Sequence, residues 1–200
     1  MSIYKSTKKD IEFILKNDPA LVSGDKYKLK DYLGVLIIYP SVHAMIMHRF
    51  AHKLYKKDFR FTSRFISQVS RFFTGIEIHP GATIGEEILI DHGMGVVIGE
   101  TAEVGNRVTI YQGVTLGGTG KDVGKRHPTL GNDIVVGSGA KILGPITIGN
   151  GCKIGANSVV LDNIGENNTV VGVKAQIKTK KVVQINIENN AQDSKNKEVC

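Results

Sequence analysis

Residues 130–160 read LGNDIVVGSGAKILGPITIGNGCKIGANSVV, and this stretch decides the fold. An aliphatic residue occupies every sixth position: Leu130, Val136, Ile142, Ile148, Ile154 and Val160. A small or β-branched residue lies two positions before each of the last five, namely Ile134, Ala140, Ile146, Cys152 and Ser158. A helix repeats its apolar face about every 3.6 residues and a half-buried strand about every two, so this period indicates another architecture.

The same period continues toward the N-terminus, in one run at Ile98, Val104, Ile110 and Leu116 and another at Ile78, Ile84 and Ile90. This pattern predicts a mainly β domain over residues 76–173, built as a parallel β-helix of hexapeptide units. Each unit is one short strand plus a corner, where glycine permits the turn. The aliphatic residue points inward, three units complete a coil, and stacked coils bury a continuous apolar column.

The run is interrupted between Leu116 and Leu130, whose spacing of 14 equals two units plus two extra residues. The interrupting loop, residues 117–129, reads GGTGKDVGKRHPT. A polar, glycine-rich loop that leaves a regular coil is a typical place for functional residues. We therefore expect function in this loop.

Both ends of the chain lack the six-residue period. Residues 1–75 have helical spacing, and we expect four helices there: one opened by a capping pair at Thr7 and Asp10 and ended by Asp18-Pro19, then 29–39, 41–57 and 63–73. Gly75 is expected to close the last helix. Residues 174–200 are rich in Asn, Lys and Gln, and we expect a partly disordered tail.

Composition narrows the function. The net charge is +7, but residues 1–75 carry 14 Lys or Arg against 6 Asp or Glu, whereas residues 76–173 carry 6 against 10. A nucleic-acid-binding protein usually concentrates its basic face in the main domain, so we expect no nucleic-acid partner. No stretch is long and apolar enough for a membrane span, and we expect no membrane association. Cys152 and Cys200 are isolated, which predicts no disulfide framework and a cytoplasmic location.

Five short motifs add chemistry to the coil: EIHPGA at 77–82, DHG at 91–93, VIGETA at 97–102, TLGGTGK at 115–121 and KRHP at 125–128. With them the chain resembles the serine acetyltransferases, from about Asp18 to about Val173. Other hexapeptide acyltransferases share the coil but not this combination. The resemblance implies a left-handed parallel β-helix with an N-terminal α-helical segment. It also implies an acyltransferase that moves the acetyl group of acetyl-CoA to the hydroxyl of L-serine, in cysteine biosynthesis.

The resemblance implies two catalytic residues. His92 matches the general base that takes the proton of the serine hydroxyl, a task that suits an imidazole near neutral pH. Glu77 matches the acidic partner that orients this histidine and stabilises its imidazolium. Many relatives have aspartate at this position, and glutamate keeps the charge on a longer side chain.

The same resemblance implies four substrate-binding residues. Asp18 and Asp91 match positions that hold the serine ammonium. Arg126 matches the residue that pairs with the serine carboxylate, for which a guanidinium is well shaped. His127 matches a second active-site histidine, near the substrate and the thioester.

Acetyl-CoA is implied as the co-substrate, with no metal. It is expected in a groove between neighbouring subunits, in contact with Gly118, Thr119, Ser138 and Ala156, with Lys153 as a phosphate contact. The backbone amides around residues 117–118 are candidates for stabilising the tetrahedral oxyanion.

The family also implies assembly and regulation: a homotrimer or a dimer of trimers, with L-cysteine as feedback inhibitor at the serine site. Many members end in an isoleucine that docks into O-acetylserine sulfhydrylase. This chain ends in Cys200, which argues against that complex. Relatives usually have proline where this chain has Lys174, a change that either loosens the turn or adds a phosphate contact.

Several alternatives stay open at this point. The coil also fits an acyltransferase for a sugar or a xenobiotic alcohol, or a catalytically silent scaffold. His48 and His52, four residues apart, have a spacing that can bind zinc, although helix packing is the simpler interpretation. His79 reads as a structural residue beside its proline, and Asp18 also fits a simple helix end. The histidine spacings do not match the zinc ligands of γ-type carbonic anhydrases.

Overall fold

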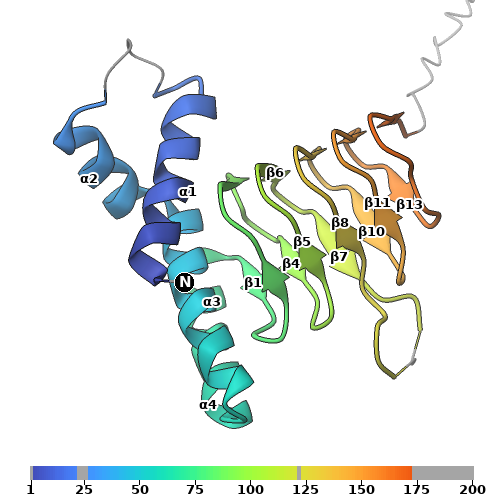
Figure 1. The fold of residues 1–200 in the computed structure, drawn as a ribbon, viewed down its shortest axis with the longest axis horizontal. Coiled ribbons are helices and arrows are strands. Elements are labelled where there is room, and N and C mark those ends of the chain that lie inside the picture. Colours follow the sequence, from blue (N-terminus) through green and yellow to red (C-terminus); the bar gives the residue numbers. More distant parts are fainter. Residues whose placement is uncertain (1, 22–26, 121–122, 173–200) are drawn as a thin grey trace, which may run out of the picture.

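The computed structural model describes residues 2–21, 27–120 and 123–172. The tail at 174–200, with Lys174 and Cys200, lies outside the described residues. Helices gather at one end of a solenoid of short parallel strands, and the last coil, around β13 (Val159–Val160), forms the far end (Figure 1).

The helices are α1 (Ile3–Asn17), α2 (Leu29–Ile38), α3 (Pro40–Lys56) and α4 (Arg60–Thr74). Pro40 occupies the first turn of α3, where its missing N–H costs nothing, and Gly75 ends α4 with a left-handed φ of 71°. Among the described residues no single helix meets the length and hydropathy of a membrane span. The pair α2 and α3 does so together, with a 76° bend between the two helices.

The predicted start of the first helix is wrong. α1 begins at Ile3, so Thr7 and Asp10 lie inside it and are buried. Asp10 makes tertiary contacts instead of a cap. Its Oδ1 accepts the N–H of Ile88 at 3.1 Å, and its Oδ2 lies 2.5 Å from a guanidinium nitrogen of Arg49. The carboxylate therefore joins α1 and α3 to the first coil.

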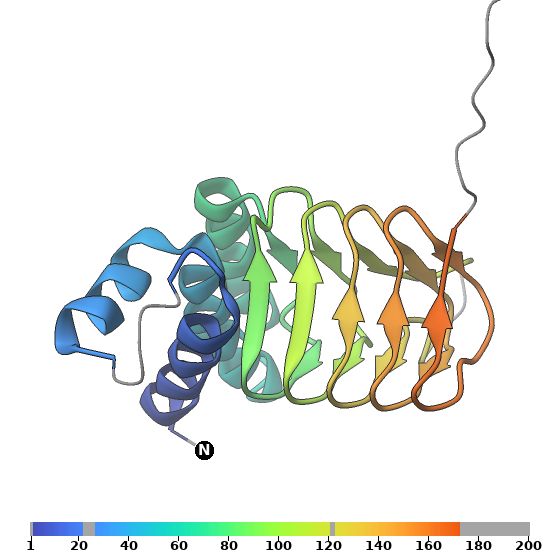
Figure 2. The same ribbon diagram turned by 90° about the horizontal axis from the view of Figure 1, so that it is seen from above.

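The strands form three parallel sheets. Sheet A contains β1 (Glu77–Ile78), β4 (Val97–Ile98), β7 (Thr115–Gly117), β10 (Lys141–Leu143) and β13. Sheet B contains β2 (Thr83–Ile84), β5 (Glu103–Val104), β8 (Thr129–Leu130) and β11 (Thr147–Ile148). Sheet C contains β3 (Ile88–Asp91), β6 (Val108–Tyr111), β9 (Val135–Val136), β12 (Lys153–Ile154) and β14 (Thr169–Val170), seen side by side in Figure 2.

The strand register confirms the inward positions predicted from the period. In sheet A, Ile98 pairs with Leu116, which pairs with Ile142. All thirteen predicted inward residues are buried except Ile84, which is partly buried in the first coil. Stacking in register therefore aligns the aliphatic side chains into one apolar column.

The 14-residue spacing between Leu116 and Leu130 differs in the structure from the predicted two units plus two residues. β7 and β8 are successive strands on neighbouring sheets, so Leu116 and Leu130 are separated by one six-residue unit plus eight inserted residues, not by two units plus two. The described residues of this loop, 118–120 and 123–128, lie between the end of β7 at Gly117 and the start of β8 at Thr129, and Figure 1 shows them as an excursion from the coil. A similar, smaller insertion of two residues separates Ile90 from Ile98.

The apolar column predicts a sharp contrast between two aliphatic truncations. Leu116 is 0% exposed, whereas Val135 points outward and is 37% exposed. We expect Leu116→Ala to lower the free energy of unfolding by about 2–5 kcal/mol, because it leaves a cavity in the column. Val135→Ala should lower it by less than about 1 kcal/mol. Urea unfolding of the two variants measures this, and equal losses would contradict an inward Leu116.

Candidate active site

Two corners of the solenoid hold most of the predicted site residues, while Asp18 follows α1 and Glu77, Asp91 and Lys153 lie in strands. The C–A corner, where the chain passes from sheet C to sheet A, comprises residues 92–96, 112–114, 137–140 and 155–158. The A–B corner comprises residues 79–82, 99–102, 118–120, 123–128 and 144–146. Sheet A lies between them.

A pocket of about 630 Å³ opens at the C–A corner, where the helical segment meets the first coil. Asp18 and Asp91, predicted to hold an ammonium, both line it, together with His92. Its other lining residues are Pro19, Ala20, Ile38, Tyr39, Pro40, Ser41 and Ile90. The structure thus brings two carboxylates and an imidazole to one cavity, with Asp18 from the end of α1 and the adjacent Asp91 and His92 from the end of β3.

His92 has an unusual backbone conformation. It follows the end of β3 with φ 57°, in the left-handed region that few non-glycine residues adopt. The Asp91 carboxylate stabilises this turn, because its Oδ1 accepts the N–H of His92 at 2.9 Å. The following Gly93 is also left-handed, with φ 69°. The turn presents an exposed imidazole at the edge of the pocket.

The predicted pairing of Glu77 with His92 is not observed. The Glu77 carboxylate lies 3.1 Å from Arg64 and 3.4 Å from Arg71, both on α4. No hydrogen bond joins it to His92 within the described part of the chain. The Glu77 strand does border the C–A corner, because the N–H of Gly95 donates to the carbonyl of Gly75. Two guanidinium groups therefore hold this carboxylate close to the corner, and neither contact involves the imidazole of His92.

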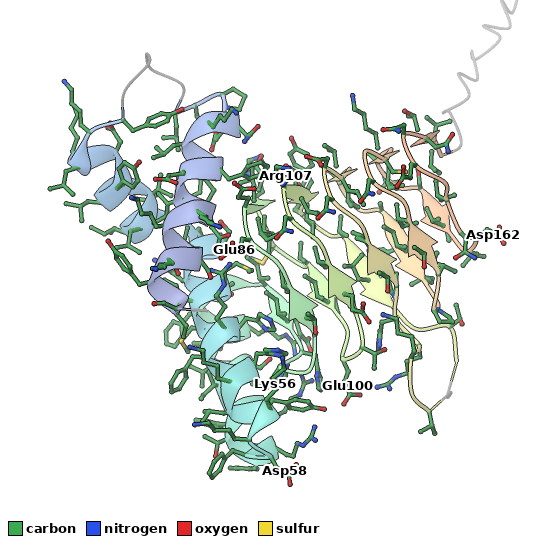
Figure 3. All side chains as sticks on the ribbon, viewed as in Figure 1. Lys56, Asp58, Glu86, Glu100, Arg107 and Asp162 are labelled. Atoms are coloured by element: carbon green, nitrogen blue, oxygen red, sulfur yellow. The ribbon has the colours of Figure 1, made fainter. Side chains whose placement is uncertain are left out.

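Arg126 and His127 lie at the other corner. Arg126 donates to Oε2 of Glu100 at 2.5 Å, and Tyr55 of α3 donates to Oε1 of the same carboxylate at 2.7 Å. The bonds from Tyr55 and Arg126 lower the pKa of Glu100 to about 2. Figure 3 shows Glu100 on the side of the solenoid next to α3 and α4. In this state an ionised carboxylate holds the guanidinium that was expected to bind the serine carboxylate.

His127 is held in one tautomer by Thr101. The Thr101 hydroxyl oxygen accepts two backbone hydrogen bonds, from the amide N–H of Arg126 at 3.0 Å and from that of His127 at 3.1 Å. These two bonds occupy both lone pairs of the oxygen. Its single hydrogen is then left for Nδ1 of His127, 2.9 Å away, and the Thr101 N–H also points to Nδ1 at 3.2 Å. Nδ1 is therefore an acceptor, and the ring proton is on Nε2.

The His127 ring is also confined sterically. It is 8% exposed, and a Cβ on Gly99 would lie 2.0 Å from the ring, so this position requires glycine. Burial, followed by the charge of Arg126, lowers the pKa of His127. A neutral Nε2–H imidazole in a fixed orientation is a hydrogen-bond donor at neutral pH.

The residues predicted to contact acetyl-CoA divide between the two corners. Ser138 and Ala156 lie at the C–A corner, in coils further from the helices than His92. Gly118 and Thr119 open the excursion at the A–B corner, where a Cβ on Gly118 would lie 3.2 Å from the carbonyl of Arg126. Lys153 is exposed on the outer face of β12. No hydrogen bond between described residues joins the two corners.

Sequence reasoning missed several residues that shape these clusters. Glu100 and Thr101 belong to the VIGETA motif, so the sequence contains a local signal for these two residues. Tyr39 and Tyr55 carry no local signal, because they reach the site only through the packing of α2 and α3 against the coil. Their contribution depends on tertiary structure.

The remaining histidines serve packing. Burial, followed by the charge of nearby His52, lowers the pKa of His48 to about 3. Nδ1 of His52 lies 2.8 Å from the carbonyl oxygen of Pro80. Nδ1 of His79 accepts the N–H of Gly81 at 3.0 Å. Within residues 2–21, 27–120 and 123–172, no group of three His, Cys, Asp or Glu is arranged to hold a metal ion.

Comparisons with known proteins agree with this architecture. Residues 127–162 match the family model described as bacterial transferase hexapeptide (six repeats). The serine acetyltransferase of Bacillus subtilis is 52% identical over 190 residues, which cover 95% of this chain and 84% of the relative. That of Helicobacter pylori is 56% identical over 170 residues, covering 85% and 95%.

Solved structures give the same result. Serine acetyltransferase isoform 3 of Entamoeba histolytica, in complex with cysteine, matches with a TM-score of 0.80 and 40% identity over 90% of this chain and 61% of that one. The Neisseria gonorrhoeae enzyme in complex with serine matches with a TM-score of 0.78 and 38% identity, over 88% and 68%. These matches confirm the left-handed parallel β-helix with its N-terminal helices. By its sequence, its fold and its paired carboxylates beside an imidazole, the chain belongs to the serine acetyltransferase family.

Proposed function

We propose that the pocket at the C–A corner binds L-serine and that His92 removes the proton of its hydroxyl. The observation that carries this proposal is the meeting of Asp18, Asp91 and His92 in one cavity. Two carboxylates complement an ammonium, which selects an amino acid over a sugar or a simple alcohol. The serine bound to the Neisseria relative supports the same assignment.

The reaction is an acyl transfer. His92 takes the hydroxyl proton as the serine oxygen attacks the thioester carbon of acetyl-CoA, which gives a tetrahedral oxyanion. Collapse of this intermediate breaks the carbon–sulfur bond. The imidazolium of His92 then returns its proton to the CoA sulfur, so that O-acetyl-L-serine and CoA leave and the base is regenerated.

His127 is proposed to stabilise the oxyanion. Thr101 leaves its proton on Nε2, and burial keeps the ring neutral, so the group is a preorganised donor. Gly118 is a second candidate donor. Its N–H has no hydrogen-bond partner in the described ranges, and it adjoins the Arg126 carbonyl.

Acetyl-CoA is proposed to lie along the C–A corner. No side chain projects from the corner at Gly113 and Gly139, which stack on each other with left-handed φ values of 70° and 71°. Ser138 and Ala156 continue the same row with small side chains. Lys153, exposed on the neighbouring face, suits a phosphate.

The active site is proposed to form between copies of the chain in a homotrimer. His92 lies at the corner that precedes the strands of sheet A, and Arg126 lies at the corner that follows them. One molecule of the size of serine does not reach from one corner to the other. A threefold arrangement would bring the C–A corner of one copy to the A–B corner of the next. Arg126 would then exchange Glu100 for the serine carboxylate.

L-Cysteine is proposed to bind the same pocket. It carries the same ammonium and carboxylate as serine and differs only in its thiol, so Asp18 and Asp91 would hold it equally well. Cysteine is bound to the Entamoeba relative. Competition between the two amino acids for one pocket would give feedback inhibition.

The proposed base predicts a large loss in one variant. His92→Ala should lower the serine-dependent release of CoA thiol by about 10²- to 10⁴-fold, because the hydroxyl loses its proton acceptor. His43→Ala is the matched control, since His43 contacts the carbonyl of Leu36 and does not line the pocket. A His92→Ala enzyme with parental activity would rule out this base, and a parent that ignores L-serine would rule out the substrate.

The packing of His127 predicts a second loss. Gly99→Ala adds a methyl group where the ring lies, so it displaces Nε2 from the oxyanion. We expect kcat to fall by about 10²- to 10³-fold. Gly34→Ala is the control, because nothing lies within 4 Å of its new methyl group. Steady-state kinetics of the two variants decide the matter, and a normal kcat in Gly99→Ala would exclude His127 as the donor.

The shared site predicts complementation between inactive chains. His92→Ala and Arg126→Ala are each expected to be nearly inactive alone. Mixed trimers, made by refolding the two variants together, contain some interfaces with an intact His92 facing an intact Arg126, and activity should return in part. If each chain formed its own site, the mixture would stay as inactive as its components.

A further inference from the structure

Tyr39 lines the C–A pocket but takes no part in the proposed reaction. It forms the joint between α2 and α3, as the C-cap of one and the N-cap of the other. Its side chain lines the pocket, and its hydroxyl donates a hydrogen bond to Oδ2 of Asp18. The phenol therefore contacts a carboxylate that was expected to bind the substrate ammonium.

The hydrogen bonds of Asp18 leave it able to accept more. Its Oδ1 accepts the N–H of Ala20 at 2.9 Å, and its Oδ2 accepts the phenol of Tyr39. An ionised carboxylate has about four acceptor positions, so each oxygen keeps one of them. The two donors hold the carboxylate in one orientation, and the free positions remain for a ligand with several N–H groups.

The charges around the phenol also favour a cation. Burial, followed by the hydrogen bond to Asp18 and the charges of Asp18 and Asp91, raises the pKa of Tyr39. The phenol thus stays protonated and acts as a donor at any physiological pH. It adds no positive charge to the pocket, which is lined by the two carboxylates of Asp18 and Asp91.

A second polar group in this pocket has no partner. Ser41 is 3% exposed and lines the same cavity, yet its hydroxyl makes no hydrogen bond to any residue in the described ranges. A buried hydroxyl without a partner is costly, and a polar ligand in the pocket would relieve that cost. The cavity is therefore built for a ligand that is both cationic and hydrogen-bonding.

We propose that Tyr39 is a positioning residue that sets the selectivity for an α-ammonium group by holding Asp18 in its binding orientation. The proposal deepens the proposed binding of L-serine and rests on it. Without the phenol, only the N–H of Ala20 holds the Asp18 carboxylate, so its orientation is less restricted. The ammonium would then meet one oriented carboxylate instead of two.

Tyr39→Phe tests this directly, because it removes the hydroxyl and keeps the ring. We expect the KM for L-serine to rise roughly 10- to 100-fold, as for a lost hydrogen bond to a charged group, with kcat changed less than about threefold. The KM for acetyl-CoA should not change. Tyr32→Phe is the matched control, since its phenol meets Glu12 on the outer side of α1 and does not line this pocket.

Two further measurements separate positioning from a general structural effect. In an Asp18→Ala background, Tyr39→Phe should cause no further loss, because it acts through the missing carboxylate. Inhibition by glycerate, which has the carboxylate and primary hydroxyl of serine but no ammonium, should be the same in Tyr39→Phe as in the parent.

The outcomes distinguish this proposal from the function beneath it. An unchanged KM for serine in Tyr39→Phe, additive losses in the double variant, or an equal loss of glycerate inhibition would each overturn the role of Tyr39 and leave the enzyme's function intact. A parent enzyme to which serine does not bind, measured by calorimetry, would overturn the proposed function as well.

Discussion

Stacking of the coils in register is the constraint on which the rest of the structure depends. Each inward aliphatic residue lies on the one from the coil before, and the corners stack in the same way. A methyl group added to Gly139 would lie 2.2 Å from Oδ1 of Asn157 in the next coil. Most corner positions therefore tolerate little variation.

Two groups of proposed site residues lie where the coil departs from six residues. The two-residue insertion between Ile90 and Ile98 contains the left-handed turn of His92. The eight-residue insertion between Leu116 and Leu130 contains Arg126 and His127. An insertion frees the chain from the register of its neighbours, so a side chain there can be aimed by local hydrogen bonds. The stack supplies rigidity, and these two insertions carry His92, proposed as the base, and Arg126 and His127, proposed to contact the substrate.

Much of this could be predicted from the sequence because the repeat is a local property. Period six fixes which residues face inward, and the motifs marked both corners. Contacts between segments that are distant in the sequence could not be predicted in this way. Glu77 could not be known to pair with Arg64 and Arg71, since those residues approach only when α4 packs on β1. Thr7 and Asp10 look like a helix start, but burial against the first coil decides their place. Tyr39 reaches Asp18 through the packing of α1 against α2 and α3, not through sequence proximity.

The helical segment is consequently part of the proposed active site. One wall of the C–A pocket comes from the end of α1, which carries Asp18, and from the joint between α2 and α3. The buried pair of Asp10 and Arg49 fixes α1 and α3 against the first coil, in front of the turn that presents His92. The imidazole proposed as the base belongs to the solenoid, whereas one of the two carboxylates proposed to recognise the ammonium belongs to the helices. Substrate recognition thus depends on the rigid docking of one segment against the other, and the pocket exists only where they meet.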